Sequence, residues 1–345
     1  MRKALFSLFL MMPCLSFSQL EHYNTYTIAF YNVENLYDTI DDVNTFDEDF
    51  TPQGKQKFNG KDYKRKLKNL SQVISEIGRS KPPVIMGLAE IENATVLQDL
   101  VDTSKLAPFH YDFIQFDSPD LRGIDVALLY QIGIFKPIFQ EAIEVKIWDE
   151  SGMRIFTRDI LYISGILDDE EIHIFVNHWP SRRGGEEVSE SKRIKAAYVL
   201  KGKIEEIQTE KPEAKIVVMG DFNDNPTDKG IKEVLNSKGT MEEVGLEDFF
   251  NPYEKLFKKG FNTLAHWDQL HLFDQLLVSD SFLPIRKNAD KLFFLKAEIY
   301  NPAYLSNLSG KYRGYPKRSF VNNRFSNGFS DHYPVYISLI KQKKL

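Results

Sequence analysis

Eight short runs rich in Ile, Val, Phe and Tyr recur along the chain, and they constrain its fold more than any other feature. The runs predict strands at residues 27–32, 84–89, 125–130, 160–167, 172–177, 215–219, 275–279 and 335–340. Apolar residues at helical spacing mark two further stretches, 63–77 and 187–207, and predict helices there. Because the strands outnumber the helices and do not simply alternate with them, the pattern disfavours a doubly wound parallel sheet.

The runs 160–167 and 172–177 are separated by a short acidic turn that begins with Asp168 and Asp169. This spacing predicts a β-hairpin and therefore antiparallel sheet. The sequence contains no Gly-rich phosphate-binding motif of the dinucleotide or P-loop type. It also contains no internal repeat and no Gly/Ser-rich or Pro-rich linker, so we predict one α+β domain over residues 19–345.

Residues 1–18 are predicted to be a cleaved signal peptide. Arg2 and Lys3 precede an apolar stretch from Ala4 to Leu15, and small residues follow at the expected cleavage region. The stretch is too short to span a bilayer, and the alternative is a buried N-terminal helix. We therefore expect a secreted or periplasmic protein that is not inserted in a membrane. The oligomeric state stays open, with a monomer as the simplest expectation.

The charge balance restricts how the chain could handle polyanions. The whole sequence has a formal net charge of −5, and loss of Arg2 and Lys3 with the signal peptide makes it more negative by two. An acidic protein does not coat nucleic acid nonspecifically, so a polyanionic substrate would need a local basic patch or a bound cation. The only cysteine, Cys14, lies in the predicted signal peptide, which excludes disulfides and cysteine zinc sites from the mature chain.

Carboxylate, amide and imidazole side chains stand where the predicted strands end. They are Asn32, Glu34, Glu90, His178, Asp221, Asn223, Asp274, Asp331 and His332. Each alone is an ordinary turn or structural residue, but a sheet brings its strand ends together in space. Oxygen donors suit a hard cation such as Mg²⁺, Mn²⁺ or Ca²⁺ rather than zinc or copper. Two histidines beside such a cation suit hydrolysis of a phosphate ester.

Six segments carry these residues and resemble, in order, the motifs of the endonuclease/exonuclease/phosphatase superfamily. They are residues 31–37 (YNVENLY), 88–92 (LAEIE), 177–180 (NHWP), 220–224 (GDFND), 273–276 (FDQL) and 330–335 (SDHYPV). Together they extend over nearly all of the mature chain, and the stretch 177–185 is most similar to the secreted bacterial nuclease-like branch. The resemblance implies a four-layer α/β/β/α sandwich with two mostly antiparallel β-sheets and the active site at one end of the sheets.

The resemblance also implies a role for each motif residue. Glu90 would be the main carboxylate ligand of a Mg²⁺ ion, with Mn²⁺ or Ca²⁺ as alternatives. Asn32 and Asp331 would lie near the same ion, and Glu34, an aspartate in some members, would lie behind the direct ligands. Asp221 and Asn223 would orient the attacking water and the phosphate, and His178 would contact a phosphate oxygen. Asp274 would hold the tautomer of His332. Either Asp221 or His332 would remove the proton from water.

Basic residues near the motifs are candidates for substrate binding. Arg158 has the position of a phosphate-binding arginine in the family, although Arg154 is an alternative. Arg182 and Arg183 follow His178 closely, and Arg193 lies in the next predicted helix. The segment 311–324 interleaves basic and aromatic residues, including Arg318, as expected where phosphates and bases are both bound. The alternative for that segment is a solvated basic loop with ordinary surface aromatics.

The predicted function is therefore that of a secreted, Mg²⁺-dependent phosphodiesterase, foremost a nuclease that hydrolyses extracellular nucleic acid. A phosphatase, or a phospholipid or sphingomyelin phosphodiesterase, could use the same residues. The lipid alternative calls for an exposed hydrophobic hairpin beside the site, and the sequence shows no clear one. A noncatalytic binding protein of the same fold is disfavoured, because the chain keeps every predicted metal carboxylate and both histidines.

Overall fold

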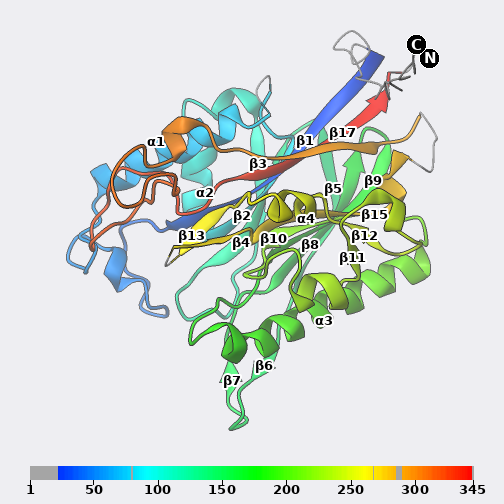
Figure 1. Cartoon of the computed structure of the whole chain (residues 1–345). Coiled ribbons are helices and arrows are strands. Elements are labelled where there is room, and N and C mark those ends of the chain that lie inside the picture. The colour runs from blue at the N-terminus through cyan, green and yellow to red at the C-terminus, as the bar shows by residue number, and fades with distance from the viewer. Residues whose placement is uncertain (1–21, 79–80, 267, 285–289, 344–345) are drawn as a thin grey trace, which may run out of the picture.

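The computed structural model describes residues 22–78, 81–266, 268–284 and 290–343 (Figure 1). The predicted signal peptide, residues 1–18, lies outside the described residues. Within them, no helix combines the length and the apolar character needed to cross a membrane.

Two large sheets form the centre of the described structure. The order in the first sheet is β16 (Phe293–Ile299), β17 (Val335–Gln342), β1 (Tyr23–Leu36), β2 (Ile85–Ile91), β4 (Asp125–Gln131) and β3 (Tyr111–Gln115). The order in the second is β11 (Ser237–Lys238), β12 (Phe249–Phe250), β15 (Asp274–Ser279), β10 (Lys215–Asp221), β9 (Glu170–His178), β8 (Ile160–Leu167) and β5 (Phe135–Ile143). Among these described strands only the pairs β1–β2, β9–β10 and β11–β12 are parallel, so both sheets are mostly antiparallel.

Helices cover the outer faces of the two sheets. Helices α1 (Gly60–Glu76) and α2 (Ala94–Val101) lie against the first sheet, α3 (Glu186–Glu210) lies against the second, and the short α4 (Pro252–Lys258) packs beside β15 (Figure 1). Two small hairpins complete the set, β6 (Ile147–Trp148) with β7 (Arg154–Ile155) and β13 (Leu264–His266) with β14 (Gln269–His271). This arrangement is the four-layer sandwich expected from the sequence.

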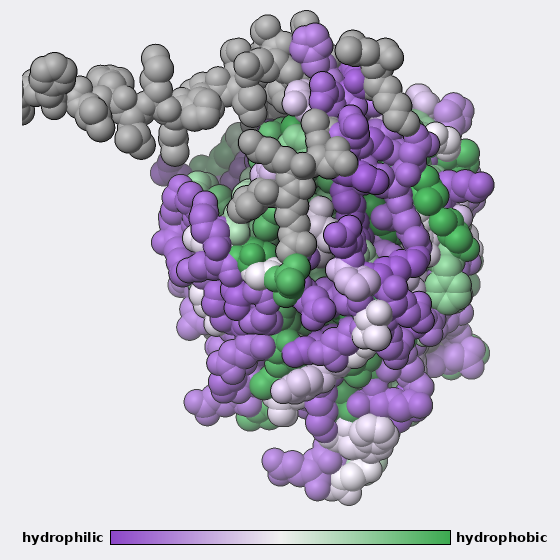
Figure 2. Space-filling model, turned by 90° about the vertical axis from the view of Figure 1, so that its right-hand side faces the viewer, coloured by the Kyte–Doolittle hydropathy of each residue, from purple (hydrophilic) through white to green (hydrophobic). Residues whose placement is uncertain are grey.

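The alternation of side chains along a strand explains the layering. Ile28 and Phe30 of β1 point into the apolar cluster between the sheets, whereas Ala29 and Tyr31 point into the cluster beneath α1 and α2. Successive side chains of a strand face opposite sides, so a strand with a layer on each side is apolar at nearly every position. The outer surface is mostly hydrophilic with scattered hydrophobic residues in the face shown in Figure 2.

The sequence-based assignments of secondary structure agree with the structure. All eight predicted runs lie on strands, with only Val84 falling outside, and both predicted helices are present. The predicted hairpin is β8–β9, and its turn residues Asp168 and Asp169 have φ of 49° and 64°, the conformation that a tight two-residue hairpin turn requires. Strand β5 was not predicted because it is a half-exposed edge strand of mixed polarity that includes Pro137.

Candidate active site

The register of the second sheet places three predicted site residues in one row. Asp221 at the end of β10 pairs with His178 on β9 and with Asp274 on β15. Residues paired across neighbouring strands lie side by side. The three side chains therefore meet at the same end of these strands, although they are far apart in the sequence. The register thus brings together three residues that the sequence analysis placed at separate strand ends.

The first sheet contributes its residues through irregular backbone. Glu90 has φ of 65°, and the pairing of β2 with β4 shifts register around it, so the residue forms a bulge. Glu34 and Asn35 have φ of 52° and 55° and interrupt the pairing of β1 with β2. Such conformations of non-glycine residues cost about 1–3 kcal/mol each and are typical of functional sites, where bulges redirect side chains. Here they bring the Asn35 amide 2.8 Å from the Glu90 carboxylate.

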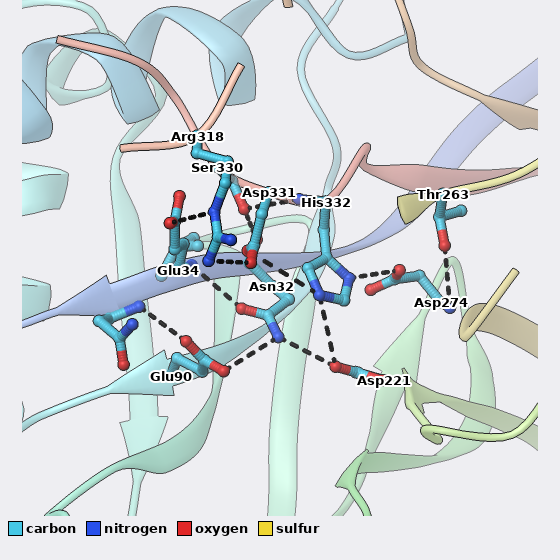
Figure 3. A network of polar contacts seen from close by, with 12 residues as sticks. Asn32, Glu34, Glu90, Asp221, Thr263, Asp274, Arg318, Ser330, Asp331 and His332 are labelled. Atoms are coloured by element: carbon cyan, nitrogen blue, oxygen red, sulfur yellow. Dashed lines mark hydrogen bonds and ion pairs between the residues drawn. The ribbon is translucent and has the colours of Figure 1, made fainter. Parts of the chain in front are cut away.

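Asn32 connects the two sheets at the centre of the site (Figure 3). Its Nδ2 donates to Oδ2 of Asp221 at 3.0 Å and lies 3.4 Å from Oε1 of Glu90, while its Oδ1 accepts from the Glu34 amide at 3.0 Å. The carboxamide is buried. Asn32 therefore fixes the position of Glu90 in the first sheet relative to Asp221 in the second.

His332 lies between two carboxylates of the row. Its Nδ1 is 2.7 Å from Oδ2 of Asp274, and its Nε2 is 3.8 Å from Oδ2 of Asp221. Ser330 fixes the segment, because its hydroxyl donates to the carbonyl of Asn32 and accepts from the His332 amide. Asp221, Asp274 and His332 also form a group whose ligand atoms are close enough to hold a metal ion. The other oxygen of Asp274 is buried and has no hydrogen-bond partner among the described residues.

Burial and charge set the protonation of these groups. Burial raises the pKa of Asp221 to about 6, and the nearby His332 opposes this. Burial alone would lower the pKa of His332, but the charges of Asp274 and Asp221 outweigh it and raise that pKa well above its usual range. Burial lowers the pKa of His178 well below its usual value, and the charges of Arg158 and Arg122 add to the effect. The two imidazoles thus differ, with His178 neutral at pH 7.

Glu34 is turned toward the segment that precedes Asp331. Its carboxylate accepts from the amide of Ser319 and from Nε of Arg318, the latter at 3.2 Å, and Arg318 in turn lies 2.9 Å from Asp331. Burial raises the pKa of Glu34 to about 7. The carboxylate of Glu34 is therefore bound by the segment that contains Arg318, as in Figure 3.

Lys66 of α1 is a buried part of the same network that the sequence analysis missed. Its ammonium donates to the carbonyls of Val33 and Glu34 at 3.0 and 2.7 Å and to the hydroxyl of Ser319 at 2.8 Å. Burial lowers the pKa of Lys66 to about 8. A signal was available, because Lys66 lies on the apolar face of its helix beside Leu67 and three residues after Tyr63.

Arg158 is buried, and its guanidinium group binds other residues of the protein. One guanidinium nitrogen lies 3.0 Å from Oδ2 of Asp120, and another donates to the carbonyl of Trp179 at 2.6 Å. The same carbonyl accepts from the carboxamide of Asn223 at 3.0 Å. Arg158 therefore fixes the backbone just after His178 instead of standing open to a ligand.

Two more predicted substrate-binding arginines hold the loop after β10. Arg193, a predicted substrate-binding residue, is only 1% exposed and its guanidinium binds Asp224, so in this structure it is paired within the protein and is not open to a ligand. Arg182 donates to the carbonyl of Asn223 at 2.9 Å and pairs with Glu186 and Asp228. Arg183 is exposed.

The segment 311–324 has two different parts. Phe320 packs against Phe50 and Phe58 with ring centroids 5.2 and 5.3 Å apart, so it belongs to the apolar packing over the first sheet. Tyr312 is 53% exposed, and Arg318 keeps half of its side chain exposed beside Asp331. Phe320 is therefore part of the packing of the protein, whereas Tyr312 and Arg318 remain accessible to a ligand.

Comparison with known proteins identifies the family. A family model described as the Endonuclease/Exonuclease/phosphatase family matches residues 27–341. An endonuclease/exonuclease/phosphatase family protein from Bacteroides thetaiotaomicron is 18% identical with a TM-score of 0.57, and the match covers 93% of this chain and 99% of that one. No curated protein matches significantly.

Two further solved structures share the fold at similarly low identity. A mannosyl-6-phosphatase from B. thetaiotaomicron is 17% identical with a TM-score of 0.56, covering 91% of this chain and 99% of that one. D. rerio TDP2, complexed with a single-strand DNA product, is 16% identical with a TM-score of 0.52, covering 91% and 98%. These structures show the same fold, and the family model over nearly the whole chain establishes that this chain belongs to the endonuclease/exonuclease/phosphatase family, whose members are phosphoric ester hydrolases.

Proposed function

We propose that the chain is a secreted phosphodiesterase that depends on a divalent cation and hydrolyses nucleic acid. The observation that carries this proposal is the meeting of the Asp274–His332 pair with Asp221, while Nε2 of His178 lies 3.7 Å from Asp221 and 4.0 Å from Glu90. Side chains that can bind or transfer protons thus lie close to Glu90, a carboxylate of the first sheet.

The donor set fits a hard cation such as Mg²⁺, with Mn²⁺ or Ca²⁺ as alternatives. Glu90 and Asp331 supply carboxylate oxygens, the type of ligand that such cations prefer. Asn32 lies between the sheets, with its Nδ2 toward Glu90 and its Oδ1 bound by the amide of Glu34. The side chains of Glu90 and Asp331 are 15% and 29% exposed, whereas those of Asp221 and Asp274 are nearly inaccessible. An ion bound by Glu90 and Asp331 would neutralise charge on the phosphate group.

The protein groups would divide the remaining work. Asp274 holds Nδ1 of His332, so that Nε2 faces Asp221, and one of these two groups takes the proton from the attacking water. The neutral imidazole of His178 can donate from Nε2 to a phosphate oxygen. Arg318 stands exposed beside Asp331, where it can reach the substrate.

Nucleic acid is favoured as the substrate by two observations. D. rerio TDP2, which shares the fold, binds a single-strand DNA product. Exposed basic residues also lie close in sequence to the motif residues, with Arg318 before Asp331 and Arg183 after His178. They would offset the net negative charge of the chain.

A lipid phosphodiester is a second candidate because of one surface feature. The β6–β7 hairpin projects from the body in Figure 1, and Trp148, Met153 and Phe156 around it are 48%, 69% and 43% exposed. The chain leads from this hairpin directly to Arg158, which donates to the carbonyl of Trp179 beside the site. The sequence analysis found no such hairpin, because only the structure shows that these side chains are exposed.

One panel of substrates tests both candidates. The mature protein is incubated with supercoiled plasmid, linear RNA, sphingomyelin vesicles and a small chromogenic phosphodiester or phosphomonoester, each with EDTA, Mg²⁺, Mn²⁺ or Ca²⁺. The nuclease proposal expects cation-dependent cleavage of plasmid or RNA that is lost in Glu90→Gln. Cleavage of vesicles alone, with loss of that activity in Trp148→Ser, would establish the lipid candidate instead.

A further inference from the structure

Arg122 lies in the loop between β3 and β4, and no sequence motif marked it as a site residue. Its backbone amide donates to Oδ1 of Asp120 at 3.0 Å, and its Nε lies 3.3 Å from the same oxygen. The loop is pinned further by the hydroxyl of Tyr37, which donates to the Arg122 carbonyl at 2.7 Å. The Arg122 side chain nevertheless remains 44% exposed.

The charge of Arg122 is not cancelled by Asp120, because Asp120 already pairs with Arg158. The Asp120 and Arg158 side chains are 7% and 5% exposed and lie 3.0 Å apart. The guanidinium groups of Arg122 and Arg158 therefore share the carboxylate of Asp120. The Asp120–Arg158 pair is buried away from solvent. Two arginines and one aspartate, Arg122, Arg158 and Asp120, thus form a trio with a net positive charge. That charge resides on the exposed member, Arg122.

The trio is attached to the active site by hydrogen bonds. Arg158 donates to the carbonyl of Trp179, the residue after His178, and Asn223 donates to the same oxygen. Arg122 is thus connected to the backbone next to His178 through Asp120 and Arg158.

The other arginines of the site are balanced differently. Arg318 contacts both Glu34 and Asp331, Arg182 contacts Glu186 and Asp228, and Arg193 contacts Asp224. Each of these three has at least one carboxylate that no second arginine holds as closely. We infer that Arg122 binds an anionic oxygen of the substrate's phosphate group, on the side of the site next to His178. The inference rests on the proposed phosphate-ester hydrolysis.

The test compares Arg122→Ala and Arg122→Lys with Arg65→Ala, which removes an exposed arginine from the outer face of α1. The first readout is binding of inorganic phosphate in EDTA by isothermal titration calorimetry, which needs no catalysis. A lost charge-assisted contact should weaken binding about tenfold or more in Arg122→Ala, and the lysine variant should recover part of it. Arg65→Ala should match the wild type.

The second readout is hydrolysis of the substrate that the panel identifies, with KM and kcat measured separately, and thermal unfolding of every variant. The inference expects a higher KM in Arg122→Ala with a melting temperature near that of wild type. Unchanged phosphate affinity and KM in Arg122→Ala would overturn it, as would equal losses in both Arg122 variants accompanied by a lower melting temperature. If the wild type hydrolyses nothing, the proposed function fails, whereas the phosphate titration still decides the role of Arg122.

Discussion

Replacement of Lys66 by Met removes one buried charge while keeping most of the volume of the side chain. In the wild type, this ammonium satisfies the carbonyls of Val33 and Glu34 and the hydroxyl of Ser319, which is 253 residues away. The change leaves those acceptors without a donor and removes one of the two positive charges that act on the Glu34 carboxylate, the other being that of Arg318. We expect both stability and activity to fall, because the same network fixes Arg318 beside Asp331.

The size of the effect follows from opposing contributions. Three hydrogen bonds from a charged donor at about 1.5–3 kcal/mol each set an upper limit of several kcal/mol. The variant is relieved of the cost of burying the ammonium, and Glu34 can take up a proton instead of remaining charged. Breaking a buried ion pair costs about 3–5 kcal/mol, and the loss of Lys66 lies at the lower end of that range because Arg318 still pairs with Glu34. We therefore expect Lys66→Met to lower the free energy of unfolding by about 3 kcal/mol.

Urea unfolding followed by tryptophan fluorescence measures this difference. Lys64→Met is the matched control, since Lys64 lies on the same helix with its side chain exposed, and such a change costs no more than about 0.5 kcal/mol. Adding Glu34→Gln completes a double-mutant cycle, in which the second change should cost less in the Lys66→Met background than alone. A loss below about 1 kcal/mol for Lys66→Met, or strict additivity with Glu34→Gln, would refute the stabilising role of Lys66 in this network.

Three further predictions concern the metal site, the histidine pair and a buried carboxyl group. Glu90→Ala should abolish cation-dependent hydrolysis and weaken Mn²⁺ binding in a calorimetric titration while circular dichroism stays unchanged; wild-type metal affinity would contradict the assignment. His332→Ala and Asp274→Asn should each lower kcat by at least about a hundredfold, and a double variant whose loss equals the product of the single losses would argue against a working pair. Burial raises the pKa of Asp125 to about 7 from 3.8, so the folded state holds this proton more tightly than the unfolded state and loses stability as pH rises from about 4 to 7. Asp125→Asn should therefore gain stability relative to wild type between about pH 5 and 7.5 in urea unfolding, by up to about 4 kcal/mol at about 1.4 kcal/mol per pKa unit, and a pH-independent difference would contradict this.

Local sequence patterns were sufficient for most of the secondary structure. The β8–β9 hairpin followed from two apolar runs around an acidic turn, and α1 followed from apolar residues at helical spacing. These features depend on residues that are neighbours in the chain, so their signals are contained in short windows. Strand β5 was not predicted, because a strand at the edge of a sheet can have a sequence of mixed polarity. Its edge position depends on how the other strands of the sheet pair.

The sequence also showed which carboxylate, amide and imidazole side chains stand at the ends of predicted strands. It did not show how these side chains are arranged in space. The register that aligns His178, Asp221 and Asp274, and the bulge that turns Glu90, depend on pairing between strands that are distant in the chain. A shift of one residue in any pairing would send a side chain to the opposite face of its sheet.

The roles of the basic residues were decided by tertiary structure alone. Arg193 and Arg182 follow His178 in the chain as a phosphate-binding patch would, yet carboxylates after β10 occupy them. Lys66 carries no motif, yet it ends beneath Glu34 and Ser319. A cation in a sequence can bind a substrate, a backbone carbonyl or a carboxylate. Which of these it does depends on the partner that folding brings within about 3 Å and on how far burial excludes water, and neither is a property of the local sequence.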